Sequence, residues 1–427
     1  MSPPQQVEPG SLEQPAAVMP PHAVRLLFTN PDVRVVEDAD AVVVTTGSGA
    51  MSADGLPIDG TMVRLRLRNS SVTDVTLARS VTTSDELYFN TTDSGGITVS
   101  DHFRNAIAVL PTDERRVSQE AVCDHFLFRT TPGYSTYVDG IQRVGQGSVV
   151  TRGRSGAVSA VVAQTLDLVE TRANGLKDAA DVLDSALELE VAPLRDLPDV
   201  ANLLSGGIDS TLIQSYLGRG RTLSSSIDSP EFRFEESYAR AASGILGTEH
   251  TVCTIAEREY LSRLEDCIVA LGAPPHHLQT VLLDTAFQTG PSGYVTAQFA
   301  DALFGLDAAR RAAAVWPWRS VLRSFRAPPV VPARVRKAWT SRRNTARSLA
   351  QPLRDPAGFA SRFAVYSEIP LAEQLFGADM VERRFARRHE YIDERIRVGS
   401  EGSELARQLE QGHWLDFFCD NTVSIWR

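Results

Sequence analysis

The sequence is poor in lysine and cysteine. Lys177 and Lys337 are the only lysines, so nearly all positive charge is carried by arginine, and the formal net charge is still −10. A general nucleic-acid-binding protein usually carries a basic excess, so this class is excluded. The four cysteines lie far apart, with no CxxC pair and no histidine at zinc-ligand spacing. Free thiols in a reducing compartment are therefore expected.

Long apolar runs are also absent. No run reaches the roughly 20 residues that a membrane-spanning helix needs. Residues 1–22 are rich in proline and glutamine, and they lack the basic start and apolar core of a signal peptide. We therefore expect a cytoplasmic protein that does not bind membranes, with a disordered tail over residues 1–22.

The chain divides into two parts by the period of its apolar residues. Residues 23–155 contain short β-rich runs separated by Gly, Asp, Asn and Ser turns, which predict an antiparallel β domain. A helical period is expected from about residue 160 to 190. From residue 198 strands alternate with helices, which predicts a doubly wound parallel sheet in an α/β domain over residues 160–427. Beyond residue 316 the chain is expected to form a helical extension.

The stretch "LLSGGIDSTLIQSYL" (203–217) places a loop between a predicted buried strand and an amphipathic helix. Ligands of open α/β sheets bind at such strand ends. The unpaired amides and the dipole of a helix N-terminus favour an anion, and Gly206 and Gly207 allow close approach of a phosphate. Ser205 and Ser210 offer hydroxyl donors. A phosphate-binding loop is the favoured prediction.

Asp209 is the informative residue of this loop. A carboxylate beside a phosphate repels it unless a divalent cation lies between them, so Asp209 indicates magnesium. No lysine follows the glycines, so this is not a GxxxxGK[ST] loop. The competing interpretation is a plain Gly-Gly turn with Asp209 as a helix cap.

The sequence resembles the asparagine synthetase family. "SGGIDS" is similar to the SGGxDS loop of ATP pyrophosphatases, "EESYARAASGILGTEHTV" (235–252) resembles the family's "DES-YA…LGTEH" stretch, and "VTAQFADALFG" (295–305) resembles its "LSGEGADELFG" loop. "ELYFNTTDSGGITVSDHFRNAI" and "YVDGIQRVGQGSVV" look like the later part of its N-terminal glutaminase domain. The resemblance covers roughly residues 75–310, and it implies a degenerate glutaminase-like domain over residues 23–155.

The resemblance also implies the cofactors ATP and Mg²⁺ and a set of binding residues. In that family a substrate carboxylate attacks the α-phosphate of ATP, and a nitrogen nucleophile then displaces AMP from the acyl-adenylate. The residues implied to bind the nucleotide are Ser205, Gly206, Gly207, Asp209, Ser210, Ser225 and Ile227, and those implied to bind magnesium are Asp209 and Asp301.

The sequence departs from the family at four places. The glutamine-dependent members expose a catalytic cysteine at residue 2, where this chain has serine, so glutaminase activity is not expected. The family's "DEP" carboxylates are replaced by Gly272 and Ala273, and its "SGEGADE" loop reads "TAQFADA" here. No lysine occupies the place of the family's late catalytic lysine, so a partner chain completing the site is an open alternative.

Three functions are compatible with these features. The first is an AMP-forming amide ligase acting on a small-molecule or peptide carboxylate of specialised metabolism, without its own glutaminase. The second is an intramolecular lactam or macrolactam cyclase, because β-lactam synthetases and lasso-peptide cyclases share the loss of the cysteine. The third is a degenerate nucleotide-binding scaffold.

Overall fold

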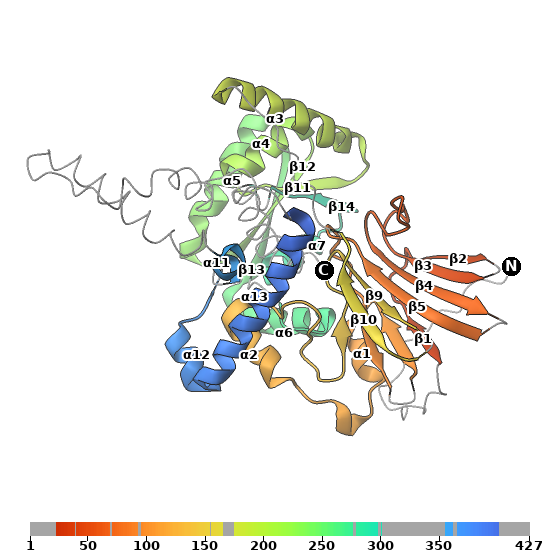
Figure 1. The fold of residues 1–427 in the computed structure, drawn as a ribbon. Coiled ribbons are helices and arrows are strands. Elements are labelled where there is room, and N and C mark those ends of the chain that lie inside the picture. The colour runs from red at the N-terminus through yellow and green to blue at the C-terminus, as the bar shows by residue number, and fades with distance from the viewer. Residues whose placement is uncertain are drawn as a thin grey trace, which may run out of the picture.

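The structure is a computed structural model that describes most of the chain between residues 23 and 400 (Figure 1). The predicted tail over residues 1–22, the metal-ligand candidate Asp301 and most of the predicted helical extension lie outside the described residues. The described ranges are 23–38, 40–68, 71–92, 95–153, 155–164, 175–275, 279–297, 300, 355–361 and 365–400.

The first domain is built on two packed β-sheets, as its short alternating runs predict. The six-stranded sheet is antiparallel throughout, in the order β10-β9-β5-β4-β3-β2. In β4, Val63 and Leu65 are buried while Arg66 and Arg68 are exposed, so period-two alternation produces one apolar and one wet face. The strands are β2 (Arg34–Asp38), β3 (Ala41–Thr45), β4 (Thr61–Arg68), β5 (Ser71–Arg79), β9 (Ser148–Arg152) and β10 (Val158–Val162).

The antiparallel β prediction for this domain is confirmed, except that the second sheet contains one parallel pair. Its order is β1-β7-β6-β8, and β1 pairs in parallel with β7. The two strands are separated by a long connection through the other sheet, and parallel pairing requires such a crossover. Side chains from both sheets, including Val63, Leu77, Phe89 and Val99, form one core. The strands are β1 (Val24–Leu27), β6 (Tyr88–Thr91), β7 (Ile97–Ser100) and β8 (Gln142–Arg143).

Two helices complete the first domain, α1 (Phe103–Ala108) and α2 (Gln119–Phe128). Ser118 caps α2 by accepting a hydrogen bond from the amide of Ala121 at 3.5 Å. Arg129 ends this helix in the left-handed conformation with φ of 58°.

The predicted helix over residues 160–190 is only partly present. Val158–Val162 form strand β10 and pair with β9, whereas helix α3 spans Leu176–Glu190. The segment "AVSAVV" is short and rich in valine, and such a run fits a strand as well as a helix by periodicity. Pairing with β9 decides in favour of the strand.

The second domain contains a four-stranded parallel sheet in the order β13-β12-β11-β14. The alternation of strands and helices predicted from residue 198 onward is confirmed. Its strands are β11 (Val200–Leu203), β12 (Arg221–Asp228), β13 (Glu249–Ala256) and β14 (Gly293–Val295). Its helices are α4 (Ile208–Leu217), α5 (Arg233–Leu246), α6 (Tyr260–Leu271) and α7 (Thr280–Phe287).

Side chains on the two faces of this sheet contact different helices. Ala201, Leu223 and Cys253 pack against Ala286 of α7 on one face. On the other face, the side-chain amide of Asn202 donates to the carbonyl of Ser210 in α4 at 3.1 Å. Because successive side chains of a strand point to opposite faces, α4 and α7 cover opposite sides of the sheet.

Three further helices follow in the C-terminal part of the described chain, α11 (Pro356–Ser361), α12 (Ile369–Phe376) and α13 (Ala378–Ser400). Helices α12 and α13 lie beside α2 of the first domain (Figure 1). Ala372 and Val381 share a buried cluster there with Leu127 and Phe128. Among the helices that the structure describes, none is long and apolar enough to cross a membrane.

An ion pair at this contact is buried. Arg384 of α13 donates from Nε to Oδ1 of Asp124 at 2.7 Å and from Nη2 to Oδ2 at 2.6 Å. Burial raises the pKa of Asp124 to about 6, against the lowering effect of Arg384. Above neutral pH the carboxylate is therefore ionised and bonded to the guanidinium on both oxygens.

Candidate functional site

The loop that the sequence predicts as a phosphate site lies at the carboxyl end of β11. Leu203 of this strand is in register with Leu223 of β12, and Asn202 is in register with Val295 of β14. The amide of Leu204 donates to the carbonyl of Leu223 at 2.8 Å, so the loop leaves the sheet only after Leu204. The loop thus begins between two neighbouring parallel strands, at the edge where open α/β sheets bind ligands.

Hydroxyl groups hold the loop in shape. Ser210 is buried and its Oγ accepts from the amide of Ser205 at 3.2 Å, while the two hydroxyls lie 3.0 Å apart. Ser205 Oγ in turn accepts from the amide of Gly207 at 3.2 Å. The structure therefore brings Ser205, Gly207 and Ser210 together, but Ser210 ties the loop to the first turn of α4. The prediction that Ser210 contacts phosphate stays a prediction.

Gly206 is required for a contact that the sequence does not reveal. Its φ of 78° is in the left-handed region, and a Cβ built there would lie 2.3 Å from the carbonyl carbon of Tyr238 and 2.6 Å from the amide nitrogen of Ala239. The loop backbone therefore packs directly against the backbone of α5. Only glycine fits this position.

We predict that Gly206→Ala destabilises the protein by about 2 kcal/mol or more, because both the backbone conformation and the contact with Tyr238 oppose a methyl group. The matched control is Gly207→Ala. Gly207 has a φ of −71°, and a Cβ there would meet only Ser205 Oγ at 3.3 Å. Urea unfolding of both variants tests this difference, and equal stability of the two variants would contradict it.

The N-terminus of α4 is open to an anion. Gly207 is the N-cap residue, and it provides no side-chain hydrogen bond to the helix. The first amides of an α-helix lack partners within the helix, and together with the dipole they attract negative charge. Asp209 lies in the first turn and is exposed. Its carboxylate is therefore available to a cation shared with an anion at the same helix end.

Ser225 and Ile227 lie on the neighbouring strand β12, further toward its carboxyl end. Both are partly buried, and Ile227 packs against Ile255, Cys267 and Val281 on the side of α6 and α7. By alternation along the strands, they face the side of the sheet opposite to Asn202 and α4. Ser225 and Ile227 thus lie toward the same carboxyl-terminal edge of the sheet as the 205–210 loop, but on the face opposite to α4.

His250 has a structural role in the same sheet. Its Nδ1 is 3.0 Å from the hydroxyl of Thr222, and its Nε2 is 3.2 Å from that of Ser224. Burial lowers the pKa of His250, with a further contribution from Arg240. The imidazole is therefore neutral at physiological pH, and it joins β12 to β13.

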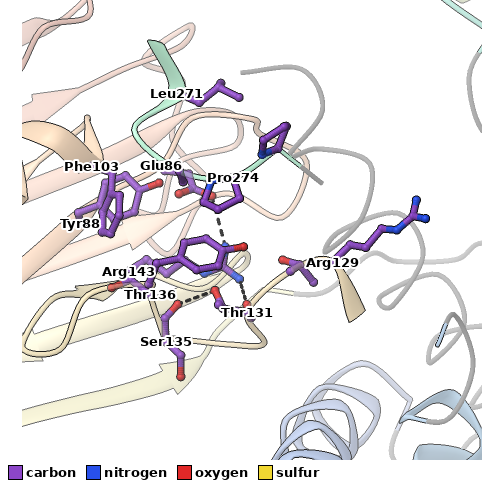
Figure 2. Close-up of a pocket in the computed structure, with 14 residues that line it drawn as sticks. Glu86, Tyr88, Phe103, Arg129, Thr131, Ser135, Thr136, Arg143, Leu271 and Pro274 are labelled. Carbon is purple, nitrogen blue, oxygen red and sulfur yellow. Dashed lines mark hydrogen bonds and ion pairs between the residues drawn. The ribbon is translucent and has the colours of Figure 1, made fainter. Parts of the chain in front are cut away.

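A half-open cavity lies where the loop after α6 meets the first domain (Figure 2). Its cavity volume is only about 30 Å³. Leu271 and Pro274 line it from the second domain, and they face Tyr88 and Arg143 of the first domain (Figure 2). Burial raises the pKa of Tyr88, so its hydroxyl stays protonated.

The carboxylate of Glu86 in this cavity pairs with two arginines of the first domain. Glu86 Oε1 lies 3.4 Å from Arg79 Nη1 and 3.5 Å from Arg143 Nη1, and both the Glu86 and Arg79 side chains are only 4 % exposed. Arg143 also donates from Nε to the carbonyl of Gly133 at 2.9 Å. Glu86 and Arg143 of the cavity wall are therefore held by contacts within the first domain.

Side chains of the first domain also contact the C-terminal end of α6. His102 Nε2 lies 2.8 Å from the carbonyl of Ala270, and Arg104 Nη1 donates to the carbonyl of Val269 at 3.3 Å. Gly272 ends the helix with φ of 72°, and a Cβ there would lie 2.8 Å from Arg104 Cγ. The terminal carbonyls of α6 thus receive donors from another domain.

One comparison with known proteins decides the family. The sequence model of the family described as asparagine synthase matches residues 181–399, which is slightly more than half of the chain. The chain belongs to the asparagine synthase family. The matched region contains the 205–210 loop and helices α4 to α7, and it extends into α13. No curated protein matches the chain.

Gly272 and Ala273, where the resemblance implies the family's "DEP" carboxylates, both contact the first domain. Ala273 is 8 % exposed and packs with Tyr88, Phe103 and Ile141 of the first domain. Gly272 is held against Arg104 in a conformation that disfavours other residues. An acidic side chain at either position would conflict with the contact to the first domain.

Residues that the sequence did not single out also shape the 205–210 loop. Asn202 anchors α4 from beneath the loop, and Tyr238 supplies the backbone against which Gly206 packs. Asn202 interrupts the apolar run "VANLL" of a buried strand, and a polar residue there is a signal that could have been used. Nothing in the sequence marks Tyr238 as a neighbour of Gly206.

The proposed metal site is only partly within the described chain. Asp209 is described, whereas Asp301 lies outside the described residues, as do Gln298 and Phe299 of the replaced acidic loop. Across the residues that the structure describes, no group of three or more His, Cys, Asp or Glu side chains forms a metal site. The metal roles of Asp209 and Asp301 stay predictions.

Proposed function

We propose that this chain is an ATP-dependent, AMP-forming amide ligase of the asparagine synthetase type. The observation that carries the proposal is the open N-terminus of α4 beside exposed Asp209, at the carboxyl end of β11, in a chain of this family. The four-stranded parallel sheet then forms the centre of a doubly wound ATP-pyrophosphatase domain. The substrate is a small-molecule or peptide carboxylate, placed in specialised metabolism.

In this proposal the chain's own groups bind the diphosphate part of ATP. The amides at Gly206 and Gly207 and at the start of α4 face the phosphate oxygens, and Asp209 with Asp301 holds Mg²⁺. Magnesium, when bound, neutralises charge that develops on the leaving pyrophosphate. Ser225 and Ile227 contribute to the nucleotide side of the site. One well-placed donor of this kind is worth about 3 kcal/mol of barrier.

The absence of glutaminase activity also belongs to this proposal. Residue 2 is serine, and Cys123 is the first cysteine of the chain. Cys123 is fully buried between α2 and the C-terminal helices, and burial raises its pKa to about 11. A buried thiol with such a pKa is a poor nucleophile. The first domain is then a truncated glutaminase-like domain that packs against the second domain.

The nitrogen nucleophile is the point at which two versions of the proposal differ. In one version a separate amine reacts with the acyl-adenylate, and in the other the amine belongs to the substrate, so that a lactam or macrolactam forms. The scarcity of lysine, with only Lys177 and Lys337 present, favours a partner chain that completes the site. A degenerate scaffold that binds the nucleotide without turnover is the competing function.

A nucleotide-binding measurement tests the proposal without knowledge of the acid. Calorimetric titration with α,β-methylene-ATP and Mg²⁺ is expected to show one site per chain, and EDTA is expected to abolish the binding. Mass spectrometry after incubation with ATP and candidate acids then separates the versions. Loss of water alone indicates a cyclase, gain of nitrogen indicates a ligase, and binding without AMP formation indicates a scaffold. Absence of nucleotide binding would exclude all three.

A further inference from the structure

Among the strands that the structure describes, β2 forms one edge of the six-stranded sheet. It is the last strand in the order β10-β9-β5-β4-β3-β2, and all five of its residues, Arg34–Asp38, are exposed. Val35 is 57 % exposed and Val36 is 63 % exposed, although the two valines point to opposite faces. Three of the five residues are charged, but the strand exposes two neighbouring valines and contains neither lysine nor proline, so its edge can pair with a strand of complementary charge.

The outward side of β2 presents backbone groups in a defined pattern. Two residues join β2 to β3, and Asp38 is in register with Ala41. In a hairpin with a two-residue loop the closing pair exchanges hydrogen bonds, so Asp38, Val36 and Arg34 bond toward β3. The amides and carbonyls of Val35 and Glu37 therefore point away from the sheet.

The sequence of β2 is complementary to itself when it is read in the opposite direction. In an antiparallel pair of two β2 strands centred on Val36, Arg34 of each strand lies opposite Asp38 of the other. Val35 of each strand likewise lies opposite Glu37 of the other. The two pairs of Arg34 with Asp38 bring opposite charges together on one face, and Val36 meets Val36 on the axis. Val35 and Glu37 are also the residues whose backbone groups point outward, as a hydrogen-bonded pair requires.

We propose that β2 pairs with β2 of a second copy of this chain, antiparallel and about a two-fold axis at Val36. The pairing joins two six-stranded sheets into one continuous sheet. A two-fold interface of this kind is closed, because the same edge is used on both copies. The contact is short, so the dimer dissociates at low protein concentration.

The side chain of Arg34 is compatible with this pairing. It donates from Nη1 to the carbonyl of Ser48 within its own chain. A guanidinium has five N–H donors, so the remaining ones can reach Asp38 of the second copy. Charge complementarity of Arg34 with Asp38 favours a copy of this chain over an unrelated strand as the partner.

Sedimentation equilibrium of the full chain between about 1 and 100 µM tests the proposal. The mass is expected to rise from 46.6 kDa toward twice that value. Arg34→Asp and Asp38→Arg are each expected to raise the dissociation constant about tenfold, because each places like charges opposite one another twice. The double variant Arg34→Asp/Asp38→Arg is expected to restore the dimer. Arg258→Asp, which changes the net charge as Arg34→Asp does at an exposed site of the second domain, serves as the control.

Cysteine cross-linking tests the register. Residues on the axis of a non-hydrogen-bonded pair have Cα atoms about 4.5 Å apart, which permits a disulfide. Val36→Cys is therefore expected to form a covalent dimer on mild oxidation, and Val35→Cys is not. A protein that stays monomeric at every concentration, a dimer that ignores both charge reversals, or equal cross-linking at positions 35 and 36 would each overturn the proposal.

Discussion

Asp209→Asn is expected to weaken binding of Mg²⁺ and ATP by about 100-fold, which makes it the largest functional effect that we predict. The exposed carboxylate of Asp209 lies in the first turn of α4, where the helix end attracts phosphate. Its negative charge is favourable there only if a cation lies between the two anions. Asparagine is similar in size but neutral, so it removes the cation contact and leaves the fold unchanged. Calorimetry with α,β-methylene-ATP measures this effect.

The control for this prediction is Asp266→Asn. Asp266 is an exposed carboxylate in α6, away from the 205–210 loop, and the substitution changes the net charge by the same amount. Asp266→Asn is expected to bind the nucleotide like the wild type. If Asp209→Asn retained full affinity in magnesium, the metal role of Asp209 would be wrong; the structure already makes Gly207, and not Asp209, the N-cap of α4.

Asp124→Ala is expected to lower the free energy of unfolding by about 3 to 5 kcal/mol. The substitution leaves the guanidinium of Arg384 buried between α2 and α13 without the carboxylate that accepts two of its hydrogen bonds. The loss is large because the exposed carboxylate of Glu120 alone then balances the buried guanidinium. Chemical denaturation above neutral pH, where Asp124 is ionised, measures the change.

Two further variants separate the buried pair from its exposed neighbour. Arg384 also pairs with Glu120, whose side chain is 54 % exposed, and Glu120→Ala is expected to cost at most about 1 kcal/mol. Asp124→Ala combined with Arg384→Met is expected to recover most of the stability, because it removes the charge as well. If Asp124→Ala and Glu120→Ala were equally mild, the buried pair would not hold the domains together.

Much of the second domain could be predicted from the sequence because its signals are local. The strand–loop–helix of residues 200–217 is marked by an apolar run, two glycines, a helical stripe and the stop at Gly218. The helix expected from residue 160 was wrong in its first part, because "AVSAVV" carries no periodicity that separates a strand from a helix. The partner strand β9 makes that decision, and pairing is not a local property.

The tertiary contacts around the site could not be predicted for the same reason. Gly206 is explained by the backbone of Tyr238, and Ala273 by a cluster around Phe103, which lies far away in the sequence. The pair of Asp124 and Arg384 spans 260 residues. The chemistry of the 205–210 loop can be predicted from residues that are neighbours in the sequence. The packing that supports the loop depends on contacts between residues far apart in the sequence.

The hydrogen bonds from His102 and Arg104 to the terminal carbonyls of α6 limit how the chain can be cut into fragments. A fragment cut to the family-matched region would begin within α3, and it would lose those donors together with the acidic partner of Arg384. Arg388 and Arg395, which are 1 % and 0 % exposed in the intact chain, would come to its surface beside bare apolar side chains. The family boundary is therefore not a place where the polypeptide can be divided, and the two halves should be expressed, purified and mutated as a single folding unit.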